Sequence, residues 1–168
     1  MKKLWCALFA GCCIFVLPVA AQDAKPAGVL NANDVKQVMP SAYFFRGQSA
    51  PVQLRNSGGI RTKDGMLVLA GLVDTSGYSS DIQQKYQGLL ITEVTLSIEG
   101  SDLKPGAYGF GFGADGKFTV MDVGAHDVFS VACQTDSELK RPVPLKVVEE
   151  GGAYRLYAGR KYVSLKMQ

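Results

Sequence analysis

The chain is poor in the residues that build disulfide frameworks, metal sites and catalytic pairs. Its 168 residues include four cysteines, one histidine and one tryptophan. Three of the cysteines and the tryptophan lie within the first 13 residues, so Cys133 is the one thiol in the rest of the chain. A single thiol excludes an intramolecular disulfide there. A zinc site needs three or four ligands with recognisable spacing, which one histidine does not supply.

The first 21 residues have the pattern of a secretory signal peptide. Lys2 and Lys3 form a positive start, and Leu4 to Leu17 is an almost wholly apolar stretch. The small residues Val19-Ala20-Ala21 then match a signal-peptidase site. The apolar stretch is shorter than the roughly 20 residues that a helix needs to span a bilayer. We therefore predict cleavage, export to the periplasm or the cell exterior, and no transmembrane segment in the mature chain.

Cleavage would leave a nearly neutral chain of one-domain size. Loss of Lys2 and Lys3 lowers the formal net charge from +3 to +1, with 16 basic against 15 acidic residues. This balance does not favour nucleic acid as a partner. Residues 22–32 are rich in small and polar residues and are expected to form a flexible leader. Residues 33–168 are then a single β-rich domain.

Two short helices are expected. The first covers residues 33–40, with Asn33 as its N-cap and Pro40 as its end. The second covers residues 80–87, where Ser80 and Gln83 have capping-box spacing and Gly88 suits the position after the last turn.

Most of the remaining chain has the pattern of short strands. Turns are expected at Asp64-Gly65, Asp115-Gly116, Gly151-Gly152 and Gly159-Arg160, which suit two-residue hairpin loops. The expected strands cover residues 42–46, 52–55, 60–62, 66–73, 89–99, 106–114, 117–123, 128–133, 144–149, 153–158 and 161–167. Many short strands with explicit turns predict a mainly antiparallel all-β domain, a single β-sandwich or flattened barrel with two short helices.

Two strands indicate how the layers pack. Residues 90–98 alternate between apolar and mostly polar side chains, which is typical of a strand with one buried face. Residues 66–73 are apolar on both faces, so both faces must be covered. A second sheet on one side and a helix or loop on the other is the favoured interpretation. A partner subunit or a ligand is the alternative.

The segment Tyr108-Gly109-Phe110-Gly111-Phe112-Gly113 alternates aromatic residues with glycine. Period two places the three aromatic side chains on one face. A two-residue loop at Asp115-Gly116 would place Gly111 opposite Val120, whose side chain could cover the glycine. The favoured interpretation is a strongly bent hairpin that closes the sandwich. The alternative is a groove in which a ligand lies on bare backbone.

The polar residues offer one weak catalytic cluster. Asp122, His126 and Asp127 lie within six residues and could form a dispersed site or ligate a metal. Their simpler interpretation is a turn capped by one of the carboxylates. Cys133 ends an apolar strand and is expected to be unreactive. We therefore assign no catalytic residue, no metal site and no cofactor.

The last hairpin is the best candidate surface for a ligand. With Gly159-Arg160 as the loop, Tyr157 lies opposite Tyr162 on the outer face, between basic residues. Tyrosines next to cations can stack on sugar rings and hold an anionic group. Arg155, Tyr157, Tyr162 and Lys161 are the predicted ligand-binding residues. The alternative is a cross-strand tyrosine pair that only stabilises the hairpin.

These patterns predict an exported small β-sandwich that serves as a non-catalytic binding or interaction module. Its partner would be an envelope polysaccharide or another protein. One alternative is an exported, hydrolase-like enzyme with a site near Asp122, His126 and Asp127. A second alternative is a structural subunit of an envelope or secreted assembly, in which a neighbouring copy covers residues 66–73.

Overall fold

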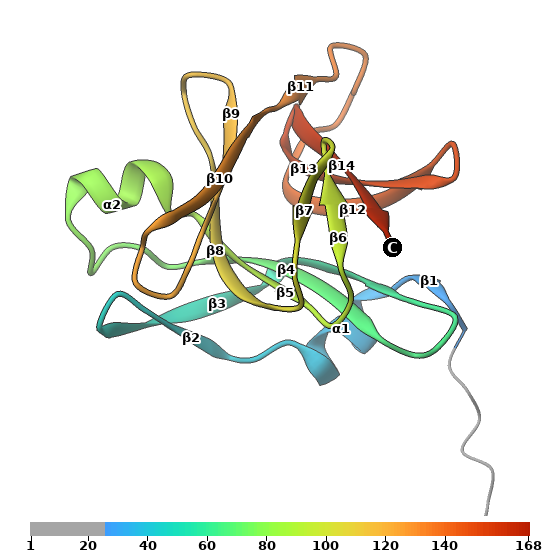
Figure 1. The fold of residues 1–168 in the computed structure, drawn as a ribbon, viewed down its shortest axis with the longest axis horizontal. Helices are drawn as coiled ribbons and strands as arrows, with labels where there is room; N and C mark the ends of the chain where they lie inside the picture. Colours follow the sequence, from blue (N-terminus) through green and yellow to red (C-terminus); the bar gives the residue numbers. More distant parts are fainter. Residues whose placement is uncertain (1–25) are drawn as a thin grey trace, which may run out of the picture.

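The structure is a computed structural model that describes residues 26–168 (Figure 1). The expected signal peptide and the start of the expected leader lie outside the described residues. The helices are α1 (Ala32–Val38) and α2 (Ser80–Lys85). The strands are β1 (Gly28–Val29), β2 (Ala42–Phe45), β3 (Gln48–Arg61), β4 (Leu67–Val73), β5 (Gly88–Thr92), β6 (Leu96–Ile98), β7 (Ser101–Leu103), β8 (Gly106–Phe112), β9 (Lys117–Met121), β10 (Asp127–Ala132), β11 (Gln134–Thr135), β12 (Val143–Glu150), β13 (Ala153–Gly159) and β14 (Lys161–Met167).

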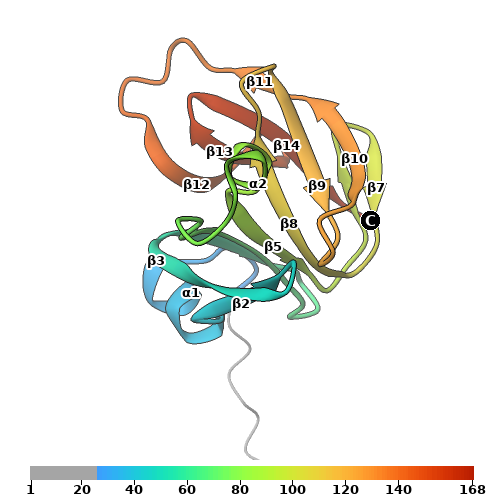
Figure 2. The ribbon, with the colours of Figure 1, turned by 90° about the vertical axis from the view of Figure 1, so that its left-hand side faces the viewer.

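The strands form two antiparallel sheets that pack as a sandwich, which confirms the predicted fold class (Figure 2). The larger sheet has the order β1-β3-β4-β5-β8-β9-β10, and β2 also pairs with β3. The smaller sheet has the order β12-β13-β14-β6-β7, and β11 also pairs with β14. No helix in residues 26–168 is long and apolar enough to cross a membrane.

The chain passes from the larger to the smaller sheet within one expected strand. Residues 89–99 form two strands, β5 and β6, because a bend separates them. At this bend the hydroxyl of Thr92 donates to the carbonyl oxygen of Val94 at 2.5 Å. Leu90 and Leu96 are wholly buried in the same core, as predicted, but the predicted wet face is found only in β6, since Ile91 of β5 packs against a second apolar cluster. Elsewhere, the stretches expected as two strands at 52–55 and 60–62 belong to one long strand, β3.

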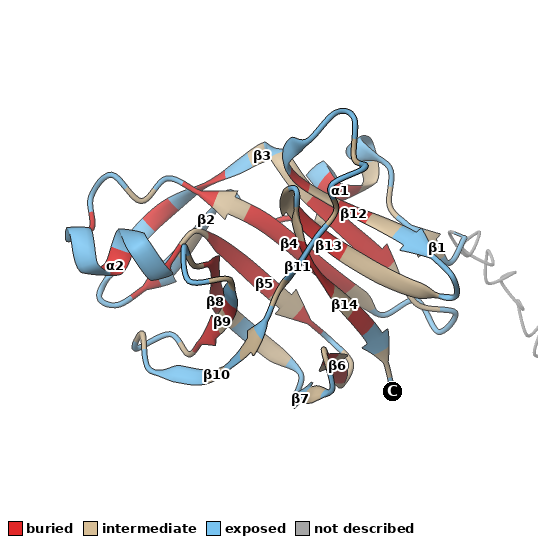
Figure 3. Ribbon diagram, turned by 90° about the horizontal axis from the view of Figure 1, so that it is seen from above, coloured by how far each residue is buried: buried red, intermediate tan, exposed pale blue. Residues whose placement is uncertain are grey.

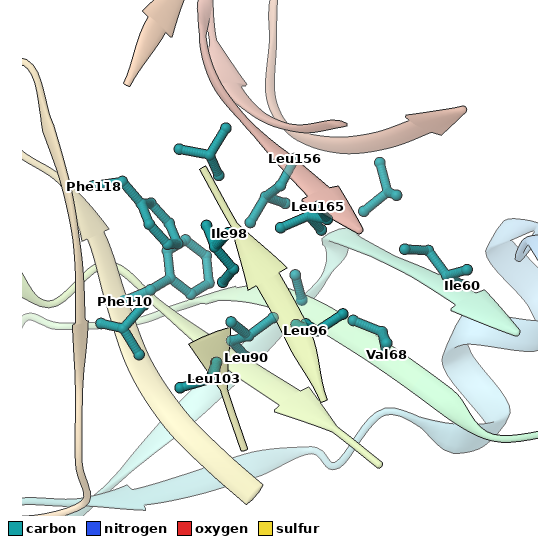
Figure 4. Close-up of a cluster of buried hydrophobic side chains, with 14 of the residues drawn as sticks. Ile60, Val68, Leu90, Leu96, Ile98, Leu103, Phe110, Phe118, Leu156 and Leu165 are labelled. Carbon is teal, nitrogen blue, oxygen red and sulfur yellow. The ribbon is translucent and has the colours of Figure 1, made fainter. Parts of the chain in front are cut away.

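The main core lies between the two sheets (Figure 4). Phe110 and Phe118 come from the larger sheet, and Leu156 and Leu165 come from the smaller one. All four are exposed by 1% or less, so their apolar area is almost wholly removed from water. Burial of this kind is the main favourable contribution to folding.

A second apolar cluster covers the other face of the larger sheet. Figure 3 shows that β4 and β5, in the middle of this sheet, are mostly buried. Val68 and Ala70 of β4 face the main core, whereas Leu69 and Val73 face this second cluster. The cover comes from α1, β2 and the segment 78–86, so both faces of β4 are covered by the chain itself. The favoured interpretation of residues 66–73 is therefore confirmed.

The glycines of β8 let the second cluster approach the sheet closely. Phe110 and Phe112 belong to the main core and Tyr108 packs against it, so the three aromatic side chains share one face, as predicted. On the opposite face, a Cβ on Gly109 would lie 2.5 Å from the ring of Phe45, and one on Gly111 would overlap the carbonyl oxygen of Lys85. The prediction that a cross-strand side chain covers Gly111 is therefore wrong. The helix α2 covers Gly111, and Phe45 of β2 covers Gly109.

Both Asp-Gly hairpins differ from the prediction. The amide of Thr62 donates to Met66 and that of Gly113 donates to Lys117, so each loop has three residues. The glycine that ends each loop has a positive φ, +84° at Gly65 and +78° at Gly116. This geometry fits a type I turn followed by a glycine bulge. The extra loop residue shifts the register, and Gly111 lies opposite Thr119 rather than Val120. By contrast, Gly151-Gly152 and Gly159-Arg160 form the predicted two-residue loops.

Both helices exist near their predicted positions but have different caps. Asn31 caps α1 by accepting from the amides of Asn33 and Asp34 at 2.9 and 3.0 Å. The predicted cap, Asn33, lies inside the helix. In α2 the capping box is wrong, because Gln83 donates to the carbonyl oxygen of Tyr78. The domain also starts earlier than residue 33, since β1 pairs with β3 within the range assigned to the leader.

Candidate functional site

The β13–β14 hairpin has the predicted register but not the predicted exposure. Tyr157 lies opposite Tyr162, and their ring centroids are 5.0 Å apart. The two residues are only 2% and 8% exposed. An exposed outer face for these tyrosines is therefore wrong, although the cross-strand tyrosine pair is confirmed.

The chain's own side chains surround this tyrosine pair. The ammonium of Lys146 lies 4.6 Å from the ring centre of Tyr157, and the guanidinium of Arg155 lies 4.6 Å from that of Tyr162. The Tyr157 hydroxyl donates to Asp136 at 3.1 Å, and the Tyr162 hydroxyl donates to Gln134 at 2.7 Å. These contacts occupy one ring face and the hydroxyl group of each tyrosine. Little tyrosine surface therefore stays accessible to a ligand.

The other two predicted ligand-binding residues have partners as well. Arg155 forms a salt bridge with Glu150 at 2.6 Å. Lys161 donates to the carbonyl oxygen of Gly113 at 2.6 Å. The structure thus places Arg155 with the tyrosine pair and Lys161 beside the glycine-rich strand. Ligand binding by these four residues stays a prediction.

The candidate catalytic residues separate into a turn and an ion pair. Asp122 accepts from the backbone amides of Gly124 and His126 at 2.8 and 2.9 Å, as a turn-capping residue does. His126 Nδ1 also lies 3.0 Å from Asp122 Oδ2. The bond from the His126 amide, and next the contact with its imidazole, hold the pKa of Asp122 below its usual value of 3.8. Asp127 instead forms a salt bridge with Lys85 of α2 at 3.0 Å. Within residues 26–168, no three His, Cys, Asp or Glu side chains are grouped for a metal.

A groove of about 590 Å³ lies between α2, the β8–β9 turn and the start of β14. We call it the helix groove. Its polar groups are largely engaged, since Lys161 binds Gly113 and Lys85 binds Asp127. The side-chain amide of Gln87 makes two hydrogen bonds with the backbone of Phe112, at 3.0 and 3.1 Å. The polar groups that would bind a ligand on the glycine backbone are therefore mostly used by the fold.

A second cavity, of about 460 Å³, opens at one end of the sandwich. We call it the end cavity. It lies between the start of β1, the turn after β3, the β12–β13 hairpin and the end of β14. Val94, Tyr154 and Met167 line it, and all three also pack against the main core. The end cavity thus has an apolar wall that continues into the interior.

The charged groups around the end cavity are not paired with one another. Arg61, Lys63, Asp64 and Glu149 line it, and none of them forms a salt bridge with another described residue. Arg61 makes a single long hydrogen bond, to Gly65 at 3.4 Å, and its buried Nε has no partner among the described residues. Burial, and next the charge of Glu149, raise the pKa of Tyr154 above 10.0. The end cavity therefore combines an apolar wall with charges of both signs that are available to a ligand.

Comparison with known proteins found no matching family model, no matching curated protein and no matching solved structure.

The residues of the end cavity carry no signal in the sequence. They come from the ends of strands and from turns, and the first and last of them, Ala27 and Gln168, lie 141 residues apart. Arg61 lies within the short strand expected at 60–62, and Tyr154 lies near the start of the strand expected at 153–158. The nearest signal in the sequence is a pair of charged residues at each of two hairpin turns, Lys63-Asp64 and Glu149-Glu150. Charged residues are ordinary in exposed loops, so these pairs do not indicate a site.

Proposed function

We propose that this chain is an exported, non-catalytic binding module whose ligand is a small molecule in the end cavity. The observation that carries the proposal is the set of unpaired charged side chains beside an apolar wall. Ligand sites in proteins commonly combine apolar walls with a few placed polar groups, in volumes of roughly 300–1,000 Å³. Export rests on the signal-peptide pattern of the first 21 residues.

The structure gives less support to the alternatives. A hydrolase-like site would need Asp122, His126 and Asp127 to act together, whereas Asp127 is held by Lys85. A structural subunit was inferred from an uncovered face of β4, and the chain covers both faces itself. A polysaccharide ligand was inferred from exposed tyrosines, and Tyr157 and Tyr162 are buried. A small ligand at the end cavity agrees with these observations.

Binding of 1-anilinonaphthalene-8-sulfonate, an aromatic anion, tests the location of the site. We expect saturable binding to the exported protein, and at least tenfold weaker binding after Val94→Trp, because the larger side chain fills part of the cavity. The matched control is Val131→Trp, which alters a half-buried valine of β10 outside the end cavity. Melting temperatures of both variants show whether they fold. Equal binding by Val94→Trp and the unchanged protein would contradict the proposal.

A further inference from the structure

Charged side chains from both sheets line the end cavity. Arg61 ends β3 of the larger sheet, and Lys63 follows it in the turn. Glu149 belongs to β12 of the smaller sheet. No salt bridge joins Glu149 to Arg61 or to Lys63. From this arrangement, and resting on the proposed function, we infer that the ligand is a zwitterion, a free α-amino acid with a large apolar side chain.

Arg61 is suited to the carboxylate of such a ligand. A guanidinium group presents planar donors that match a carboxylate in a two-bond geometry. Only the long bond to Gly65 engages these donors among the described residues. A ligand carboxylate would therefore meet a donor group that the fold leaves mostly unused.

Glu149 is suited to the ammonium group. It lies opposite Tyr154 across the hairpin, so a cation bound there would also lie near the apolar wall. Its neighbour Glu150 is already neutralised by Arg155, which contrasts with the unpaired Glu149. An ammonium group would supply the missing positive partner.

The total charge around the cavity argues against a ligand of a single charge. Arg61 and Lys63 are balanced by Asp64 and Glu149, so a simple anion or a simple cation would meet two like charges. Like charges brought together at an interface oppose binding, whereas complementary ones give specificity. The apolar side chain of the ligand would then lie against Val94, Tyr154 and Met167, where burial of apolar area favours binding.

Isothermal titration of the exported protein with four probes that share one phenyl body tests this inference. The probes are L-phenylalanine, 3-phenylpropionate without the amine, phenethylamine without the carboxylate, and uncharged 2-phenylethanol. We expect L-phenylalanine to bind at least tenfold more tightly than each of the other three.

Two charge-removing variants should then act selectively. Arg61→Gln should weaken the binding of L-phenylalanine and of 3-phenylpropionate, and it should not weaken the binding of phenethylamine. Glu149→Gln should weaken the binding of L-phenylalanine and of phenethylamine, and it should not weaken the binding of 3-phenylpropionate. The matched controls are Arg55→Gln and Glu150→Gln, which alter residues outside the cavity and should leave all four affinities unchanged.

The outcomes separate the ligand class from the site. Equal affinity for L-phenylalanine and 3-phenylpropionate, with no effect of Glu149→Gln, would overturn the inference that the ligand is a zwitterion. The proposal that the chain is a binding module would stand. Binding of the anilinonaphthalene probe at the cavity without binding of any phenyl probe would also overturn it. If neither class of probe binds at the cavity, the proposed function fails as well.

Discussion

Individual residues of the second apolar cluster differ sharply in how their polar atoms are used. Tyr86 is wholly buried and its ring stacks on Phe45 at 3.8 Å, yet its hydroxyl has no hydrogen-bond partner among the described residues. Burial raises the pKa of this hydroxyl. Tyr78 packs edge-on against the ring of Tyr86. Its hydroxyl, in contrast, donates a hydrogen bond to the carbonyl oxygen of Phe45 at 3.0 Å. The two tyrosines thus form a natural pair for measuring the effect of an unpaired buried hydroxyl.

We expect Tyr86→Phe to leave the free energy of unfolding unchanged or to raise it by about 1 kcal/mol, since a buried polar group without a partner opposes folding. We expect Tyr78→Phe to lower it by about 1 kcal/mol, because it removes a formed hydrogen bond. Urea denaturation of both variants provides the measurement. An equal loss in the two variants would show that the Tyr86 hydroxyl has a stabilising partner.

At the scale of elements, α2 and β8 depend on each other. The helix is short, and two contacts fix its last residue, Lys85. The carbonyl oxygen of Lys85 packs directly on the backbone of Gly111, and its ammonium group forms a salt bridge with Asp127. Gln87, just after the helix, hydrogen-bonds the backbone of Phe112 and thereby extends the contact. The alternating glycines of β8 therefore serve packing between layers.

We expect Gly111→Ala to lower the free energy of unfolding by about 1–3 kcal/mol, the usual range for overpacking, because the new methyl group forces α2 away from β8. The control is Gly77→Ala, where the nearest atom to a new Cβ is Gln48 Oε1 at 3.6 Å. Thermal or urea unfolding should show a change of less than about 0.5 kcal/mol for the control. A tolerated Gly111→Ala would mean that the contact with α2 is not tight.

At the scale of the whole molecule, the domain is stabilised without covalent cross-links among its described residues. Cys133 is the one cysteine described, and it is free and half-buried. Two apolar clusters on opposite faces of the larger sheet supply the stabilisation instead. The three other cysteines and the single tryptophan lie within the expected signal peptide.

Intact-mass measurement of the exported protein tests this view of the molecule. We expect a mass without residues 1–21, no tryptophan absorbance, and one thiol per chain that reacts after denaturation, because only Cys133 then remains. A mass that retains Trp5 and Cys12 would contradict cleavage.

Much of the fold could be predicted because its signals are local. Gly159 has a positive φ of 62° in a two-residue loop, and this alone sets the pairing of Tyr157 with Tyr162. The Asp-Gly turns were less informative, because the same dipeptide fits loops of two or three residues, and one extra residue shifts the register. Burial of Tyr157 could not be predicted, since Asp136 and Lys146 reach it from other segments.

The sequence by itself determined most of the strands, the places of the turns, the all-β class and the register of the last hairpin, because these follow from side-chain period and from glycine at turns. Tertiary structure alone decided which apolar faces meet, which polar groups find partners, and that unpaired charges gather at one end of the sandwich. Such contacts join residues far apart in the chain, and their free energy depends on packing and solvent exclusion that no short segment contains.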